Sequence, residues 1–187
     1  MRYFVVGDNM LTIRQAKTEE YEAVKQFYCD LIDSMQGIDS TPAWKMGVYP
    51  TEQLLKNSIN EQTLFIAKTE DCIVGAMILN HECADEYINA KWRIEANKDE
   101  VKVIHLLGVS FHHQRKGIAK QMLLSIIEIC KKNSIKAIRL DILGTNSPAE
   151  KLYSSMGFQY IDTIKLFYED IGETDFNLYE LVLSNVL

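Results

Sequence analysis

The sequence lacks the marks of several specialised classes of protein. No apolar run is long enough to span a bilayer, and no small-residue cleavage site follows the short apolar patch at residues 3–6. The four cysteines have no C-x-x-C spacing, and two of them lie in apolar, periodic stretches. This pattern indicates reduced thiols rather than disulfides or zinc ligands. We therefore expect a cytoplasmic protein that does not associate with membranes.

The sequence has fewer basic than acidic residues. Twenty lysines and arginines stand against 26 acidic residues, which gives a formal charge of −6. This balance disfavours nucleic acid as a partner and mildly favours a cationic small molecule or peptide. The length of 187 residues suits one domain with a substantial core. We expect residues 10–187 to form that domain, and residues 1–9 to be an N-terminal extension that is either an extra edge strand or the product of an upstream start.

Two common functional motifs are also missing. The chain has no G-x-G-x-x-G and no suitably placed acidic residue after a first strand and turn, which excludes a dinucleotide-binding oxidoreductase. His112 and His113 are adjacent, so their side chains diverge, and no carboxylates follow them at ligand spacing. No metal site is expected.

Hydrophobic periodicity predicts an alternation of helices and strands. Apolar residues at helical spacing predict helices at residues 18–32, 51–59, 118–130 and 149–156. Apolar, β-branched runs predict strands at residues 11–14, 63–68, 72–80, 103–109, 136–142, 158–168 and 176–183. A whole helix separates strand 103–109 from strand 136–142, which favours parallel pairing. The polar segment 81–100 has no period, and we expect it to be a long functional excursion in a mixed α/β fold with one sheet.

The most informative stretch is strand 103–109 with the turn and helix that follow it. The turn reads Q-R-K-G-I-A at residues 114–119. A helix start leaves backbone N–H groups without acceptors, and a glycine lets the chain approach a ligand closely. Free N–H groups and basic side chains at one point form an anion cradle that suits a pyrophosphate. A polar loop capped by a helix is the alternative explanation.

A second motif follows this turn. Asn146 precedes a short helix that reads A-x-x-L-Y-x-x-x-G-F at residues 149–158. With the turn Q-R-K-G-I-A, which fits the pattern Q/R-x-x-G-x-G/A, the chain resembles the GNAT superfamily of acyl-CoA-dependent N-acetyltransferases over residues 11–183. Phe111 stands where this family often has proline, and Ala119 stands where glycine is commoner. Neither difference removes the expectation of cofactor binding.

The resemblance implies both a fold and a cofactor. The fold is GNAT-like, with a mostly antiparallel central sheet, a splayed parallel strand pair and helices on both faces. The cofactor is acetyl-CoA, whose pantetheine arm would bind as a pseudo-strand between the diverging strands. The residues implied to bind it are Leu107, Gly108, Val109, Gln114, Arg115, Lys116, Gly117, Ile118, Ala119, Lys120, Asn146, Ala149 and Tyr153. Asn146 is also expected to cap its helix.

Acetyl transfer from a thioester to an amine needs a neutral amine, a stabilised oxyanion and a proton for the thiolate. In the A-x-x-L-Y frame, Tyr153 is the candidate acid, because a phenol with a pKa of about 10 donates to a thiolate of about 8.5 at little cost. A core tyrosine is the alternative. The backbone N–H of Val109 is the candidate oxyanion donor. His105, on the same strand face as Leu107 and Val109, is the candidate base or else a hydrogen-bonded core residue.

The sequence thus predicts an enzyme that transfers the acetyl group of acetyl-CoA to a primary amine of a small molecule or peptide, by direct attack in a ternary complex. A non-catalytic acyl-CoA-binding module of the same fold is the alternative. Several aromatic and acidic residues in the loops have two interpretations: they form a pocket for the acceptor amine, or they are ordinary loop packing. These residues are Trp44, Tyr49, Tyr87, Trp92, Glu82, Asp85 and Glu86. The apolar end at residues 178–187 leaves a homodimer open.

Overall fold

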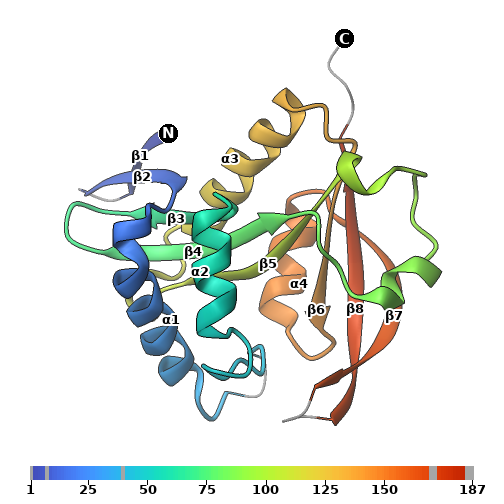
Figure 1. Ribbon diagram of the computed structural model, residues 1–187, viewed down its shortest axis with the longest axis horizontal. Coiled ribbons are helices and arrows are strands. Elements are labelled where there is room, and N and C mark those ends of the chain that lie inside the picture. Colours follow the sequence, from blue (N-terminus) through green and yellow to red (C-terminus); the bar gives the residue numbers. More distant parts are fainter. Residues whose placement is uncertain (1, 7–8, 39–40, 169–171, 184–187) are drawn as a thin grey trace. The chain divides into compact units, whose positions relative to one another are not determined.

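The computed structural model describes residues 2–6, 9–38, 41–168 and 172–183. The chain divides into two compact units, each considered by itself. The first comprises residues 1–36, 44–79 and 105–126, and the second comprises residues 37–43, 80–104 and 127–187. Strand β5 (Val101–Val109) and helix α3 (Ile118–Lys132) contribute residues to both units (Figure 1).

The strands of the first unit follow one another in chain order. They are β1 (Arg2–Val6), β2 (Asn9–Gln15), β3 (Leu64–Lys68) and β4 (Ile73–Asn80), paired antiparallel, and the end of β5 comes next to β4. Residues 2–6 of the expected N-terminal extension are therefore the edge strand of a hairpin with β2. Both β3 and β4 are buried along nearly their whole length, which explains their continuous apolar sequence. The hairpin predicted at residues 63–80 is confirmed.

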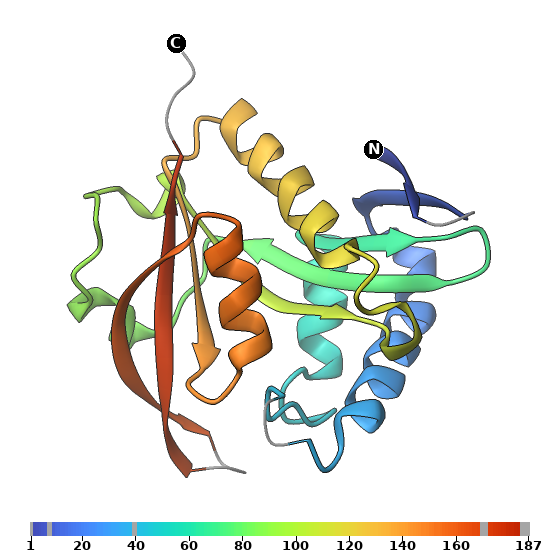
Figure 2. The ribbon, with the colours of Figure 1, turned by 180° about the vertical axis from the view of Figure 1, so that it is seen from behind.

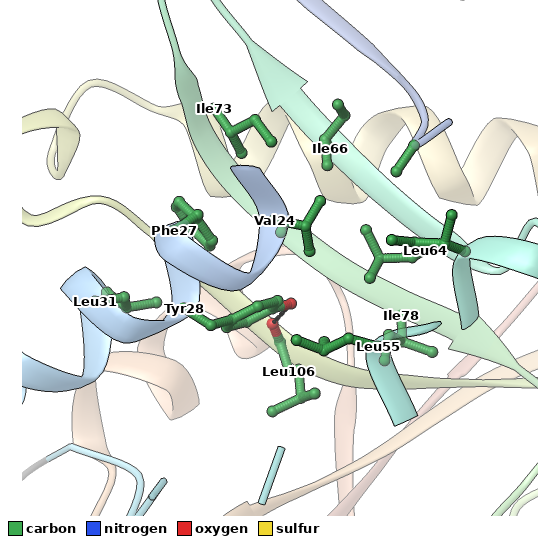
Figure 3. Close-up of a cluster of buried hydrophobic side chains, with 13 residues drawn as sticks. Val24, Phe27, Tyr28, Leu31, Leu55, Leu64, Ile66, Ile73, Ile78 and Leu106 are labelled. Carbon is green, nitrogen blue, oxygen red and sulfur yellow. Dashed lines mark hydrogen bonds between the residues drawn. The ribbon is translucent and has the colours of Figure 1, made fainter. Parts of the chain in front are cut away.

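Helices α1 (Tyr21–Met35) and α2 (Glu52–Asn60) cover one face of these strands (Figure 1). The hydroxyl of Thr51 caps α2 by accepting a hydrogen bond from the N–H of Leu54 at 3.1 Å. Side chains from both helices and from β3, β4 and β5 form one core (Figure 3), which includes Val24, Phe27, Tyr28, Leu31, Leu55, Leu64, Ile66, Ile73, Ile78 and Leu106. The predicted helical spacing of residues 18–32 and 51–59 therefore marks the buried faces of real helices.

The first part of α3 covers the opposite face of β4 (Figure 2). Met122 of α3 is fully buried there. A Cβ atom on Gly75 of β4 would lie 2.8 Å from the Met122 sulfur. A side chain at this position would therefore force Met122 to move, so glycine favours the close approach of helix and strand.

The second unit is built on three strands that follow the start of β5. In spatial order they are β6 (Ala137–Leu143), β8 (Gly172–Val182) and β7 (Gln159–Tyr168), and helix α4 (Ser147–Ser155) joins β6 to β7. The predicted parallel pair is confirmed, since residues 101–103 of β5 pair in parallel with residues 137–139 of β6. The pairs β6 with β8 and β7 with β8 are antiparallel. The mixed, mostly antiparallel α/β fold with flanking helices is the one expected.

The position of β8 bears on the expectation of a homodimer. β8 lies between β6 and β7, so its backbone has a neighbour on each side and cannot accept a further strand. Leu178 and Leu183 are buried within the unit itself. Residues 184–187, the rest of the apolar end, lie outside the described residues.

The excursion between β4 and β5 belongs to the second unit and is joined to its sheet at a buried ion pair. The carboxylate of Glu180 is fully buried and accepts hydrogen bonds from the Arg139 side chain and the Arg93 backbone N–H, both at 2.8 Å. The Arg139 guanidinium lies 4.1 Å from the ring centroid of Trp92. The segment without a period in sequence is therefore fixed to the sheet by charge and stacking.

Two further observations concern membrane spans and cysteines. No helix in the described ranges is long and apolar enough to cross a membrane. All four cysteines are free thiols; Cys130 is buried in α3, while Cys72 and Cys83 are exposed.

Candidate active site

The end of β5 departs from regular strand geometry at Leu106. This residue has a φ of +54°, in the left-handed region that costs a non-glycine residue about 1–2 kcal/mol. Its carbonyl oxygen accepts a hydrogen bond from the buried hydroxyl of Tyr28 at 3.0 Å (Figure 3). An irregularity inside a strand re-aims the residues that follow it. The helix α1 therefore holds the strand at its irregular point.

Around Leu106, buried and half-buried residues still alternate along the strand. The half-buried residues are His105, Leu107 and Val109. Gly108 lies against Leu31 of α1, and a Cβ on residue 108 would overlap the Leu31 side chain. The N–H of Ser110 donates to the carbonyl oxygen of Val74 at 2.9 Å. The alternation agrees with the predicted common face of residues 105, 107 and 109, on the side away from Leu31.

Residues 114–119 were predicted to bind an anion; residues 114–117 form a turn, and residues 118–120 begin helix α3. Arg115 and Gly117 have φ values of +60° and +77°, and left-handed residues of this kind turn successive N–H groups toward one side. Among the described residues, the N–H groups of residues 115–120 donate no hydrogen bond of ordinary geometry, and the first N–H to donate is that of Gln121, to the carbonyl oxygen of Gly117. No atom lies within 4 Å of the place where a Gly117 Cβ would stand. The backbone conformation therefore requires this glycine, and its open side is accessible to a ligand.

The turn is also positively charged. Arg115, Lys116 and Lys120 are exposed on it. Partial burial, followed by the charges of Lys116 and His112, lowers the pKa of His113 below its usual value. The preceding residues 111–113 form a single 3-10 turn, and no group of three or more metal-ligating side chains occurs in the part of the chain that the structure describes. The local charge favours an anionic ligand.

In the second unit, Asn146 immediately precedes α4 and Tyr153 lies on it. The side-chain oxygen of Asn146 accepts a hydrogen bond from the N–H of Ala149 at 3.2 Å, so its predicted capping role is confirmed. Tyr153 is 5% exposed and packs edge-on against Phe158, with ring centroids 5.3 Å apart. Its hydroxyl has no hydrogen-bond partner within the described ranges, although every fully buried polar side-chain atom there has one. The residue is therefore almost wholly buried, and its hydroxyl oxygen is not completely enclosed by protein atoms.

The environment of Tyr153 corrects one expectation. Burial, and secondarily the negative charge of Asp141, raises the pKa of Tyr153 well above its usual value. The predicted proton donor was a phenol of ordinary pKa, which gives up its proton to a thiolate cheaply. Each unit of pKa difference costs about 1.4 kcal/mol, so complete transfer from this hydroxyl is more expensive than expected. The same shift keeps the hydroxyl protonated throughout the neutral range.

Asp141 is a residue that the sequence reasoning did not single out. It lies on β6, and the hydroxyl of Tyr87 donates to its carboxylate at 2.6 Å. Its charge also acts on Tyr153. The alternation of β6 places Asp141 on the same polar face as Arg139. This alternation is the only feature of the sequence that could have drawn attention to Asp141. Nothing in the spacing indicates that a carboxylate comes near the tyrosine of α4.

The proposed acceptor pocket is not assembled within either unit. Trp44 and Tyr49 pack against the core of the first unit. Tyr87 and Trp92 pack against each other in a small core of the second unit, with ring centroids 5.3 Å apart. Of the three acidic residues, Glu82 pairs with Lys98 at 2.9 Å, and the other two, Asp85 and Glu86, are exposed. Loop packing, the alternative interpretation, accounts for Tyr87 and Trp92.

The sequence model of the acetyltransferase (GNAT) family matches residues 25–158, which is more than half of the chain. The chain belongs to the GNAT acetyltransferase family. The matched range includes the left-handed Leu106, the cationic turn at residues 114–120 and helix α4 with Tyr153. The resemblance inferred from the two motifs is thereby confirmed.

Two relatives match parts of this GNAT chain. The uncharacterized N-acetyltransferase YsnE of Bacillus subtilis is 39% identical over 69 residues, which cover 36% of the chain and 46% of YsnE. The chain thus matches less than half of that relative's length. The [ribosomal protein bS18]-alanine N-acetyltransferase of Haemophilus ducreyi is 30% identical over 101 residues, which cover 49% of the chain and 68% of that enzyme.

Solved structures agree in fold over nearly the whole GNAT chain. An acetyltransferase of the GNAT family from Listeria monocytogenes has a TM-score of 0.74 at 19% identity, covering 97% of the chain and 100% of that protein. The acetyltransferase yncA of Salmonella typhimurium, solved with its cofactor acetyl-CoA, has a TM-score of 0.65 at 17% identity, covering 93% and 94%. At these identities the likeness concerns the fold alone.

Proposed function

We propose that this GNAT protein transfers the acetyl group of acetyl-CoA to a primary amine of a small molecule or peptide. The observation that carries the proposal is the set of unpartnered N–H groups at residues 115–120, beside three exposed basic side chains. A pyrophosphate presents several anionic oxygens close together, and such a group needs several N–H donors and positive charge at one point. Membership of the family, and acetyl-CoA bound to yncA, support this choice of donor.

The residues proposed to bind acetyl-CoA are those of the two sequence motifs and of the strand before them. The turn formed by Gln114, Arg115, Lys116, Gly117, Ile118, Ala119 and Lys120 would hold the phosphates. The end of β5 at Leu107, Gly108 and Val109 would bind the amides of the pantetheine arm through its backbone. The remaining contacts are assigned to Asn146, Ala149 and Tyr153 of α4, by analogy with the family pattern.

The reaction is a direct transfer in a ternary complex. The lone pair of the neutral amine attacks the thioester carbonyl carbon, so that a C–N bond forms and the carbonyl oxygen becomes an oxyanion. The backbone N–H of Val109 is the proposed donor to that oxyanion. Collapse of the tetrahedral species breaks the C–S bond, the amine loses one proton to a base, and the thiolate gains one. The products are an amide and coenzyme A.

Tyr153 is the proposed donor to the departing thiolate. Its raised pKa means that the hydroxyl is always protonated at neutral pH and can donate a hydrogen bond to sulfur as negative charge develops there. Burial and the charge of Asp141 disfavour the phenolate form of Tyr153. Full transfer of its proton is therefore expected only if no other group stabilises the thiolate. The hydroxyl is free of other partners in the described chain, as this role requires.

Two groups are candidates for the base. His105 is half-buried on β5 and has an imidazole that titrates near neutrality in its usual state. Asp141 is the second candidate, because it lies close enough to Tyr153 to influence its pKa and is oriented by the Tyr87 hydroxyl. The pH dependence of turnover separates them. His105→Gln should remove one ionisation from the pH profile of kcat if histidine is the base, and Asp141→Asn should remove one if aspartate is.

The test begins with binding. Calorimetry should detect both acetyl-CoA and coenzyme A, and the double variant Arg115→Gln/Lys116→Gln should weaken binding by about tenfold or more, because charge-assisted hydrogen bonds are lost. Lys131→Gln/Lys132→Gln is the matched control, since it removes the same charge from the exposed far end of the same helix and should leave binding unchanged. Absence of binding by the folded wild type would refute the proposal.

Turnover is tested by release of free thiol from acetyl-CoA with a panel of amines. The panel includes short peptides with free N-termini, polyamines, aminoglycosides and amino acids. A relative named for acetylating an alanine of a ribosomal protein makes an alanine-terminated peptide a sensible first acceptor. Normal binding of acetyl-CoA with no turnover on any amine would favour the alternative, a non-catalytic acyl-CoA-binding module.

A further inference from the structure

Tyr28 of α1 is fully buried, and its hydroxyl is fixed in position. The ring makes edge-on contacts with Phe27 and Trp44, at centroid distances of 5.2 and 6.3 Å. The hydroxyl donates to the carbonyl oxygen of Leu106 at 3.0 Å (Figure 3). A buried hydroxyl is costly unless it is paired. This hydrogen bond therefore links α1 firmly to β5.

Leu106 needs such support. Its φ of +54° is unfavourable for a leucine, and the backbone irregularity turns the peptide group away from the path of a regular strand. Without the Tyr28 hydroxyl the carbonyl oxygen would lose this buried hydrogen bond, which is a second penalty. Relaxation of Leu106 toward an extended conformation would relieve both penalties and would re-aim the residues that follow.

The same helix contacts the strand again one turn later. Leu31 fills the space beside Gly108, where no Cβ would fit. After Val109, the N–H of Ser110 is fixed to the carbonyl oxygen of Val74 at 2.9 Å. Residues 106–110 are thus held on the α1 side at two points and at their end by β4.

We propose that Tyr28 is a positioning residue for acetyl transfer, which holds the Leu106 carbonyl and thereby aims the N–H of Val109 at the acyl oxygen. The inference rests on the proposed function, in which that N–H stabilises the oxyanion. A misdirected N–H loses stabilisation in the transition state while the bound cofactor is little affected, because the phosphates are assigned to the separate turn at residues 115–120. The expected signature is therefore a change in kcat without a change in KM for acetyl-CoA.

The test compares two buried tyrosines. Tyr28→Phe should lower kcat by about tenfold and keep KM for acetyl-CoA within about twofold of wild type. Tyr179→Phe is the matched control, because Tyr179 is also buried and its hydroxyl bonds to Glu150 in the second unit. The control should keep kcat within about twofold even though it also loses a hydrogen bond. A Tyr28→Phe enzyme with unchanged kcat, or an equal loss in Tyr179→Phe, would overturn the inference.

A second variant keeps the test decisive if Tyr28→Phe does not fold. Gly108→Ala pushes the strand end against Leu31 and should also lower kcat, and adding Leu31→Ala should restore it by opening space. No restoration would count against positioning by α1. The NMR signal of the Val109 amide in the acetyl-CoA complex gives a readout independent of turnover. A signal that shifts in Tyr28→Phe but not in Tyr179→Phe supports the inference even if no amine is acetylated, and an unmoved signal refutes it.

Discussion

The two units of this GNAT protein differ in the kind of candidate functional group that each provides. In the first unit the groups are backbone atoms, placed by left-handed residues such as Leu106 and Gly117 and by the unpartnered N–H groups of residues 115–120. In the second unit they are side chains, and burial and neighbouring charge set their properties, as in Tyr153 and Asp141. Backbone groups bind at every pH and tolerate side-chain variation. Side-chain groups carry proton chemistry but depend on their surroundings.

The largest expected effect is on the side-chain network of the second unit. Arg139→Leu would leave the fully buried Glu180 carboxylate without its cation, and should lower the free energy of unfolding by about 3–5 kcal/mol, measured by urea denaturation. Arg139→Met/Glu180→Gln is the control, because the glutamine still accepts from the Arg93 N–H and no charge stays buried. The double variant should recover much of the loss. Equal instability of the two variants would show that packing, not charge, holds this unit together.

The second effect concerns catalysis by the same unit. Tyr153→Phe should lower kcat by about 100-fold, because the developing thiolate loses its donor, while the Kd for acetyl-CoA stays within about threefold. Stopped assays of thiol release and calorimetry measure the two quantities. Tyr160→Phe removes an exposed hydroxyl that bonds to Thr163 and should change neither. Full turnover in Tyr153→Phe would remove the acid assignment.

The third effect concerns the backbone turn of the first unit. Gly117→Ala places a Cβ on a residue with a φ of +77°, which is strained at about 1–2 kcal/mol and tends to rotate the N–H groups around it. The Kd for acetyl-CoA should rise by about tenfold, and kcat at saturation should stay near that of wild type. Gly37→Ala provides a comparison, since that glycine has the same φ of +77° and open space around it. An equal effect of both on binding would mean that general destabilisation is measured.

The smallest expected effect is on the pH dependence of stability, through an ion pair of the first unit. The Arg14 side chain donates to both carboxylate oxygens of Glu20 at 2.7 Å, and this lowers the pKa of Glu20 from 4.5 to about 2. A depressed folded-state pKa gives stability that is complete above about 4.5 and is lost as the pH falls toward 2. Because the pair lies near the surface, solvent screening limits the contribution to about 1 kcal/mol. Urea denaturation at pH 6 and pH 3 should reveal a loss in wild type that is smaller in Glu20→Gln, and equal losses would contradict this assignment.

Much of the fold could be predicted because its signals are local. The apolar spacing of α1 and α3, the parallel pairing of β5 with β6 and the capping by Asn146 all depend on residues a few positions apart or on the connection between neighbouring elements. The cationic turn was also predictable, since glycine and basic residues at a helix start have a limited set of uses. The edge strand β1 and the early start of β8 were less determined, because a partner strand decides how far a strand extends.

The candidate site was harder to predict where burial decides it. An ordinary pKa was expected for Tyr153, and the structure buries its ring beside Phe158 and under the influence of Asp141. The excursion at residues 81–100 was expected to serve function; its aromatic side chains Tyr87 and Trp92 pack onto the sheet, and the Tyr87 hydroxyl donates to Asp141. No local pattern reports how much water a side chain loses or which charge comes near it.

By itself the sequence determined the order of elements, the position of the cationic turn and the family, because periodicity, glycine conformation and helix capping act over a few residues. Only the tertiary structure decided the left-handed Leu106, its bond to a tyrosine 78 residues away and the raised pKa of Tyr153. These properties arise from desolvation and contact between distant segments. They exist only once the core has closed around them.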